Sequence, residues 1–284
     1  MGVILPRRFV PGGYPPVITG VCDLPLSRFS TLTKTRSFGT IAQGLLYSCI
    51  DWSDDGLHMY MGILAGNQIR NFKSTTTAWD IAALTFVGKF STGYNDVHGV
   101  RVKPDGSEVW ANASTGLGNG QTLSYSLGVD YEWTETGPGA PSLINSFDNA
   151  TVDFKHLEEL NIKDDGTKII SPGNDAGSFP YGLSMTAWTG STLAYGTDNK
   201  VADCENAFIP PSGLCMYRAN SSKIITKYQF STGWDLTTLS GTVVDTLDLT
   251  SDLNGNIVGI FITEDRLFVV DDGSPSYTVY QYNA

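Results

Sequence analysis

The chain is poor in charged residues and in long apolar runs. Only 17% of its 284 residues are charged, and 29 acidic residues stand against 18 basic ones. A net charge of −11 repels a phosphate backbone, so nucleic acid is not an expected partner. No stretch reaches the roughly 18 apolar residues that a membrane span needs, so no membrane insertion is expected.

Cysteine is scarce, and no export signal is recognisable. Cys22, Cys49, Cys204 and Cys215 show no CxxC spacing, which argues against a zinc site or a redox pair. Prolines and glycines interrupt the chain after Arg8, so we predict no signal peptide. We therefore expect free, mostly buried thiols in a reducing compartment, with a bond between Cys204 and Cys215 as the alternative.

Motifs that carry catalysis are also missing. The chain has no phosphate-binding loop, no Gly-x-Ser-x-Gly elbow and no His-Glu-x-x-His zinc helix. Its three histidines are His58, His98 and His156. His58 is expected on the surface of a second strand or between strands. We predict no catalytic residue, no cofactor and no metal, and hence a protein that is not an enzyme.

What the chain does contain is a turn built on Asp-Gly that recurs about every 50 residues. The copies are residues 54–60, 104–110, 164–170, 211–217 and 263–269; the fourth has Ser-Gly and the fifth Glu-Asp at the turn. An apolar run precedes and follows each turn, which predicts a hairpin, because glycine adopts positive φ without steric cost. Stacked units of this length are typical of the blades of an all-β propeller.

Two further strands complete each repeat. The third alternates polar and apolar residues, as in residues 226–230, and a linker with tryptophan leads to the fourth. Trp79 and Trp234 lie in two linkers, and Trp133 and Trp188 are expected at equivalent places. We expect these rings to fill the wedges between blades.

The two chain ends share one repeat. Residues 278–282 match 226–230 with no fourth strand after them, whereas 31–38 resemble a fourth strand with no inner strands before it. We therefore predict a five-bladed propeller closed by an N-terminal strand; six blades would need an unseen repeat. The predicted boundaries are an extended arm at 1–23 and a propeller at 24–284, with blades at 45–94, 95–150, 151–205, 206–255, and 256–284 plus 24–44.

Alignment on the turns also places polar residues along the central channel. Ser48, His98, Glu158, Glu205 and Val258 share the position where the first strands begin. An imidazole with two carboxylates could hold a divalent cation or a sugar, although solvated residues at a channel mouth are the simpler interpretation.

A second position lies further along the first strands, with Asp51, Arg101, Asn161, Phe208 and Phe261. Asp51 and Arg101 predict an ion pair between consecutive blades. The ligand-binding candidates are thus His98, Glu158, Glu205, Asp51 and Arg101. Carboxylates from different first strands would also suit an inverting glycosidase. The aspartates at 54–55 and 164–165 are interpreted as turn residues rather than calcium ligands.

The recurring unit, Lys-Pro-Asp-Gly, then Tyr-x-Phe, then Ser-Thr-x-Trp-Asp, resembles propeller repeats of tailed-bacteriophage virion proteins. The matching stretches are residues 99–106, 227–236 and 279–282. The resemblance implies a structural or host-contacting part of a phage particle, assembled in the host cytoplasm, with no catalytic residues.

The leading hypothesis is therefore a non-enzymatic virion component of the tail or capsid. Its partners would be other virion proteins, contacted through the arm residues Arg7, Arg8, Phe9 and Tyr14, and a glycan on the host surface. A carbohydrate-binding propeller is one alternative. A glycosidase or metal-dependent hydrolase at the channel mouth is another.

Overall fold

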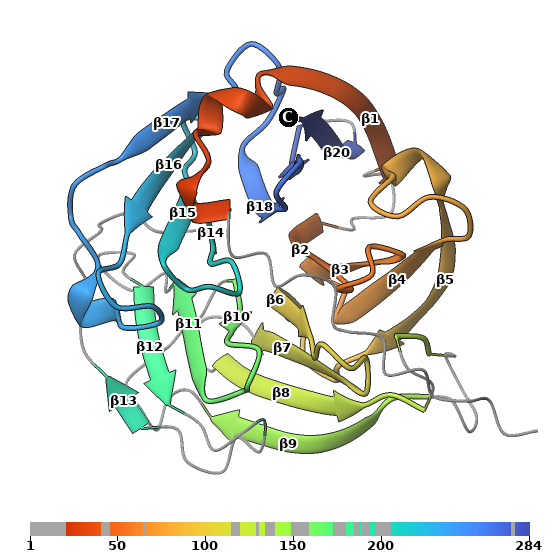
Figure 1. Cartoon of the computed structure of the whole chain (residues 1–284). Helices are drawn as coiled ribbons and strands as arrows, with labels where there is room; N and C mark the ends of the chain where they lie inside the picture. Colours follow the sequence, from red (N-terminus) through yellow and green to blue (C-terminus); the bar gives the residue numbers. More distant parts are fainter. Residues whose placement is uncertain are drawn as a thin grey trace, which may run out of the picture.

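The strands form five four-stranded antiparallel sheets arranged as a ring (Figure 1). The computed structural model describes residues 21–40, 46–64, 66–114, 120–128, 131–133, 140–148, 159–172, 180–184, 188, 194–196, 206–273 and 276–284. The prediction of an all-β propeller is confirmed. None of the helices in these residues is long and apolar enough to cross a membrane.

Four of the sheets are each built from consecutive strands. Sheet 1 contains β2 (Leu46–Trp52), β3 (His58–Leu64), β4 (Gln68–Ser74) and β5 (Leu84–Ser91). Sheet 2 contains β6 (Asp96–Val102), β7 (Glu108–Ser114), β8 (Gly120–Ser126) and β9 (Ser142–Asp148). Sheet 3 contains β10 (Asn161–Ile162), β11 (Lys168–Pro172), β12 (Pro180–Ser184) and β13 (Ala194–Gly196). Sheet 4 contains β14 (Asn206–Phe208), β15 (Cys215–Ala219), β16 (Ile224–Gln229) and β17 (Asp245–Asp248).

Sheet 5 joins the two ends of the chain. It contains β18 (Ile257–Ile262), β19 (Arg266–Asp271), β20 (Ser276–Asn283) and, as its outer strand, β1 (Thr31–Thr40). The antiparallel register runs from Thr31 opposite Asn283 to Thr40 opposite Ser276. β1 therefore supplies the fourth strand that the C-terminal repeat lacks, and sheet 5 has no unpaired edge at β20.

Short 3-10 helices precede the outer strands of three sheets. They are η1 (Val21–Asp23) and η2 (Leu26–Phe29) before β1, η4 (Ile81–Ala83) before β5, and η6 (Leu236–Thr238) before β17. Asp80 and Asp235 cap η4 and η6: each Oδ1 accepts a hydrogen bond from the backbone N–H two residues on, at 2.9 and 3.0 Å. Capping by the aspartate explains why Trp-Asp recurs in the linkers.

An aromatic ring covers the turn glycine in four sheets. Gly56, Gly106, Gly166 and Gly213 have φ between 65° and 73°, and each carbonyl accepts a hydrogen bond from a linker aromatic. These donors are Trp79, Tyr131, Trp188 and Trp234, which have positive φ themselves. A Cβ on the glycine would collide with the ring, so glycine is required for space as well as for conformation.

The second linker differs from the prediction. Tyr131, not Trp133, covers the turn glycine of sheet 2, because its N–H donates to Gly106 O at 2.9 Å. Trp133 instead packs against Tyr60 and Phe90 of sheet 1, with ring centroids 5.4 and 5.2 Å apart. Trp133 thus fills the wedge between sheets, as expected, but from another position of the linker.

Replacing Gly213 with alanine is expected to lower the free energy of unfolding by about 2–4 kcal/mol, because positive φ and collision with Trp234 act together. Gly93 provides the matched control: its φ is 81°, but nothing lies within 4 Å of a Cβ placed there. Gly93→Ala should cost about 1–2 kcal/mol for backbone conformation alone. Urea denaturation of both variants measures the difference; equal losses would show that the Trp234 contact contributes nothing.

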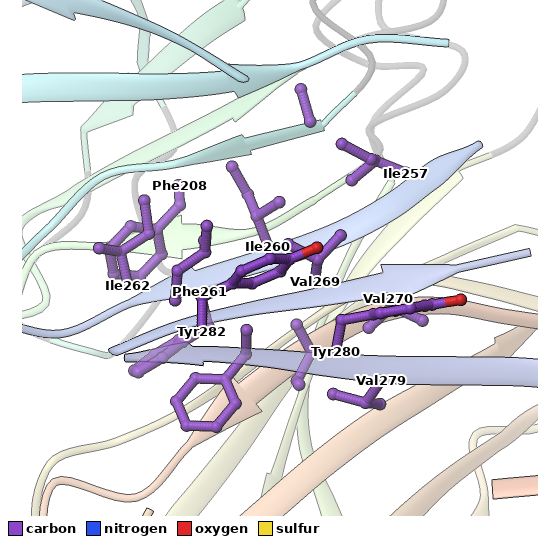
Figure 2. Packing of buried hydrophobic residues seen from close by; sticks show 14 of the residues in the cluster. Phe208, Ile257, Ile260, Phe261, Ile262, Val269, Val270, Val279, Tyr280 and Tyr282 are labelled. Atoms are coloured by element: carbon purple, nitrogen blue, oxygen red, sulfur yellow. The ribbon is translucent and has the colours of Figure 1, made fainter. Parts of the chain in front are cut away.

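Apolar side chains pack between neighbouring sheets as well as within them. Figure 2 shows Phe208 of sheet 4 beside Phe261 of sheet 5, and their ring centroids are 4.9 Å apart. Ile260 and Tyr282 are also buried in this cluster. Burial of each such side chain stabilises the fold by about 1.5–3 kcal/mol, so this packing is the main interaction that holds the sheets together.

The cysteines correct two predictions. Cys22 and Cys215 form a disulfide, and Cys49 is free and buried, so the expectation of free thiols is wrong for the first two. Cys204 lies outside the described residues. Val21 and Cys22 are 1% and 3% exposed, so the packed part of the chain begins before the predicted boundary at residue 24.

Candidate functional site

The predicted ion pair between Asp51 and Arg101 is present at the end of the first strands. Arg101 Nη1 donates to Asp51 Oδ1 at 2.9 Å, and the two side chains are 11% and 3% exposed. Asp51 Oδ2 also accepts a hydrogen bond from Val102 N at 2.8 Å. Asp51 of sheet 1 therefore binds both a side chain and the backbone of sheet 2.

Equivalent residues of the other sheets make comparable contacts. Asn161 of sheet 3 donates to Ala207 O of sheet 4 at 2.9 Å and accepts from Ile209 N, just after β14, at 2.8 Å. Phe208 contacts Phe261, and Phe261 stacks on Trp79 of sheet 1 at 5.7 Å. Each of these side chains thus reaches the next sheet of the ring.

Arg101 of sheet 2 also contacts the next sheet, since its Nη2 lies 3.6 Å from Asp164 Oδ1 in the turn of sheet 3. Burial favours a lower pKa for Arg101, but the charges of Asp51, Asp164 and Asp54 outweigh it and raise the pKa. Burial raises the pKa of Asp51, with Arg101 opposing this effect. Partial desolvation raises the pKa of Asp54 to about 6, and Arg101 counters this while Asp164 adds to it.

The space between these residues is small. A cavity of about 10 Å³ is lined by apolar side chains of the first strands together with Asp51, Arg101, Glu159 and Asn161. This volume admits about one water molecule. The arrangement can hold sheets together and hydrate a buried charge pair, but it has no room for a sugar ring.

The other predicted channel position is only partly described. His98 is half-buried, and its Nε2 lies 3.1 Å from Ser114 Oγ of the neighbouring strand. Ser48 Oγ donates to Val97 O of sheet 2. Glu158 and Glu205 lie outside the described residues, as do the arm residues Arg7, Arg8, Phe9 and Tyr14. The structure therefore brings together Asp51 and Arg101 from the predicted set.

One residue that contacts the Asp51–Arg101 pair was missed in the sequence. Asp164 was assigned only to a turn, although its alignment with Asp54 beside Arg101 was available as a signal. His58 was expected at the surface or between strands; it is 4% exposed, which excludes the surface, and its Nε2 lies 3.8 Å from Glu132 Oε1 in the linker of sheet 2. Burial lowers the pKa of His58, with Asp55 opposing the effect.

The aspartate directly before the glycine has the role expected from turn geometry in three of the turns. The Oδ1 atoms of Asp55, Asp105 and Asp165 accept backbone hydrogen bonds from the residue two positions on, at 2.9 to 3.0 Å. Across the part of the chain that the structure describes, no group of three or more His, Cys, Asp or Glu is placed to hold a metal ion.

Comparison with known proteins gives only remote similarity. No protein family and no curated protein matches the chain. A Bacteroides fragilis protein named provisionally as a 6-phosphogluconolactonase matches at 15% identity and a TM-score of 0.43, over 72% of this chain and 55% of its own. The Dos1 propeller matches at 16% identity and a TM-score of 0.41, over 86% of this chain and 56% of its own. Sqt1 from Chaetomium thermophilum matches at 11% identity and a TM-score of 0.43, over 78% of this chain and 54% of its own.

The chain spans about half the length of these structures. The strand pairing within the chain itself establishes the fold.

Proposed function

We propose that this chain is a five-bladed propeller, closed by its N-terminal strand, that acts without catalysis as a structural component of a tailed-phage particle. The observation that carries this proposal is the filled centre of the ring. Asp51, Arg101, Asn161, Phe208 and Phe261 bind neighbouring sheets, and the cavity among them is about 10 Å³. Ligand pockets usually have volumes of about 300–1,000 Å³.

A ring of packed sheets is suited to a mechanical role. Contacts between successive sheets make the disc stiff, and β1 leaves β20 without a free edge. Such a disc presents its loops at constant distances and needs no cofactor. The likeness of residues 99–106 and 227–236 to phage virion repeats supports placing this disc on a particle.

In this proposal the disc is attached through residues 1–20, with Arg7, Arg8, Phe9 and Tyr14 contacting other virion proteins. The exposed loops would contact a glycan on the host surface. Deleting residues 1–20 should leave the propeller folded, because Cys22 and β1 are retained. The deleted protein should be missing from purified particles, as measured by quantitative mass spectrometry. Normal incorporation of the deleted protein would refute the attachment.

Two further measurements separate this function from its alternatives. Binding to a glycan array that persists without residues 1–20, in a protein absent from particles, would favour a carbohydrate-binding propeller. Release of sugar from a glycan, lost on changing Glu158 to Gln or Glu205 to Gln, would favour a hydrolase. With a structural role, neither substitution should alter incorporation into particles.

A further inference from the structure

The exposed large apolar residues gather at one end of the sheets. Within the described residues they are Leu32, Phe86, Leu143, Ile144, Leu214, Val243 and Val244, with exposed fractions from 37% to 55%. All except Leu214 lie at or just before the start of an outer strand. Leu214 directly precedes β15, in the turn between the first two strands of sheet 4.

Strand register shows that these positions are equivalent. Leu32 pairs with Tyr282, Phe86 with Phe72, and Leu143 with Tyr125. Their three partners pair in turn with the second residue of β19, β3 and β7, namely Leu267, Met59 and Val109. The apolar residues therefore lie at the same end of each sheet as the Asp-Gly turns.

Contacts between sheets place these ends on one face of the ring. Arg101 of sheet 2 reaches the turn residue Asp164 of sheet 3, and Arg266 at the turn of sheet 5 donates to Trp79 O in the linker of sheet 1. We call this side, formed by the five turns and the seven apolar residues, the turn face. Among the described residues, exposed apolar side chains lie on the rim of sheets 1, 2, 4 and 5.

The turn face is also acidic. Its exposed carboxylates are Asp54, Asp55, Asp105, Asp164, Asp165, Glu264 and Asp265. Four of these carboxylates are paired with basic residues of the same face: Asp105 with Lys103, Asp164 with Arg101, Asp165 with Lys163 and Asp265 with Arg266. Asp54, Asp55 and Glu264 are the exposed carboxylates that remain for the positive charges of a partner. A partner that fits this face carries apolar side chains beside unpaired positive charges.

A segment of this composition leads to the same face. Val21 and Cys22 are held there, because Cys22 is bonded to Cys215 and its Sγ lies 3.4 Å from Ser212 Oγ in the turn of sheet 4. Residues 3–10, Val-Ile-Leu-Pro-Arg-Arg-Phe-Val, place two arginines between apolar residues. The 20 residues before Val21 can extend over roughly 60–70 Å, enough to cross the disc.

We propose that residues 3–10 dock on the turn face of their own molecule. The apolar side chains cover rim residues such as Phe86 and Leu143, and the two arginines approach the turn carboxylates. Attachment at Cys22 raises the effective concentration of the segment, which favours the same molecule over a second copy. The proposed virion contacts use the same Arg7, Arg8 and Phe9, so this docking describes the free protein, and the segment would leave the turn face on attachment to a particle.

The test is the rate at which trypsin cleaves after Arg7 and Arg8 in the full-length protein. A docked segment is protected, so cleavage should be slowed about tenfold relative to the undocked segment if about 90% of molecules are docked. Leu143→Lys and, separately, Phe86→Lys should accelerate cleavage by about this factor, because each removes an apolar contact and repels the arginines. Ser146→Lys is the matched control, since it adds the same charge at an exposed position further along β9.

Circular dichroism melts identify any variant that fails to fold, in which case the other rim variant decides the outcome. Equal cleavage rates in the wild type, the folded rim variants and Ser146→Lys would overturn the proposal. Protection that increases with protein concentration would also overturn it, because the segment would then dock on a second copy. Protection that is independent of concentration and lost only in the rim variants supports it.

Discussion

Replacing Asp51 with alanine is expected to lower the free energy of unfolding by about 3–5 kcal/mol. The change removes the carboxylate that Arg101 contacts at 2.9 Å and leaves Val102 N–H without its acceptor. Arg101 is then a nearly buried cation whose remaining described ion pair, to Asp164, is 3.6 Å long. Urea denaturation followed by tryptophan fluorescence measures the loss.

Two control variants show whether the lost charge of Asp51 causes the drop in stability. Asp51→Asn keeps an acceptor for Val102 N–H but removes the charge, so its loss should be smaller than that of Asp51→Ala. Glu264→Ala changes an exposed carboxylate of the fifth turn and should shift stability by no more than about 0.5 kcal/mol. If Asp51→Ala costs less than about 1 kcal/mol, the pair does not hold sheets 1 and 2 together.

Replacing both Cys22 and Cys215 with serine is expected to lower the free energy of unfolding by about 2–5 kcal/mol. The disulfide joins residues separated by 193 positions and attaches the segment before β1 to sheet 4. Without the bond, the unfolded chain gains conformational freedom, while the hydrogen bond from Tyr217 OH to Val21 O and that from Lys227 Nζ to Leu24 O remain. The protein should still fold, but it should unfold at a lower urea concentration.

Reduction gives an independent measurement of the same bond. Adding a phosphine reductant to the wild type should reproduce the stability of the double variant, and the double variant itself should not respond. Cys49→Ala serves as the control, because Cys49 is free and buried and its loss should leave the response to reductant intact. A wild type whose unfolding midpoint is unchanged by reductant would contradict a stabilising disulfide.

Local rules made the sheets predictable. Asp-Gly between two apolar runs specifies a hairpin whatever surrounds it, and the five copies therefore indicated the five sheets in order. The pairing of Asp51 with Arg101 followed from alignment, because equivalent positions of consecutive repeats come close at the centre of a propeller. Residues 31–38 were recognised as an outer strand for the same reason, from their likeness to other repeats.

The failures concern contacts that repeats do not encode. Cys22 lies before the first recognisable strand, so nothing in its spacing indicated Cys215 as its partner. Tyr131 covers Gly106 although a tryptophan stands two residues later, because the hydrogen bond to the glycine carbonyl selects the position rather than the residue type. His58 follows the turn of its repeat, at a position expected on the surface or between strands, but the linker of sheet 2 covers it.

The amino-acid order alone determined the strands, their turns and the grouping of consecutive strands into sheets, because these depend on neighbours within about 50 residues. The remaining features depend on closure of the ring. Closure filled the centre with side chains, joined Cys22 to Cys215, and placed Leu32, Phe86 and Leu143 on one face. These outcomes depend on distances between residues that are far apart in the chain, and such distances exist only once the sheets pack around a common axis.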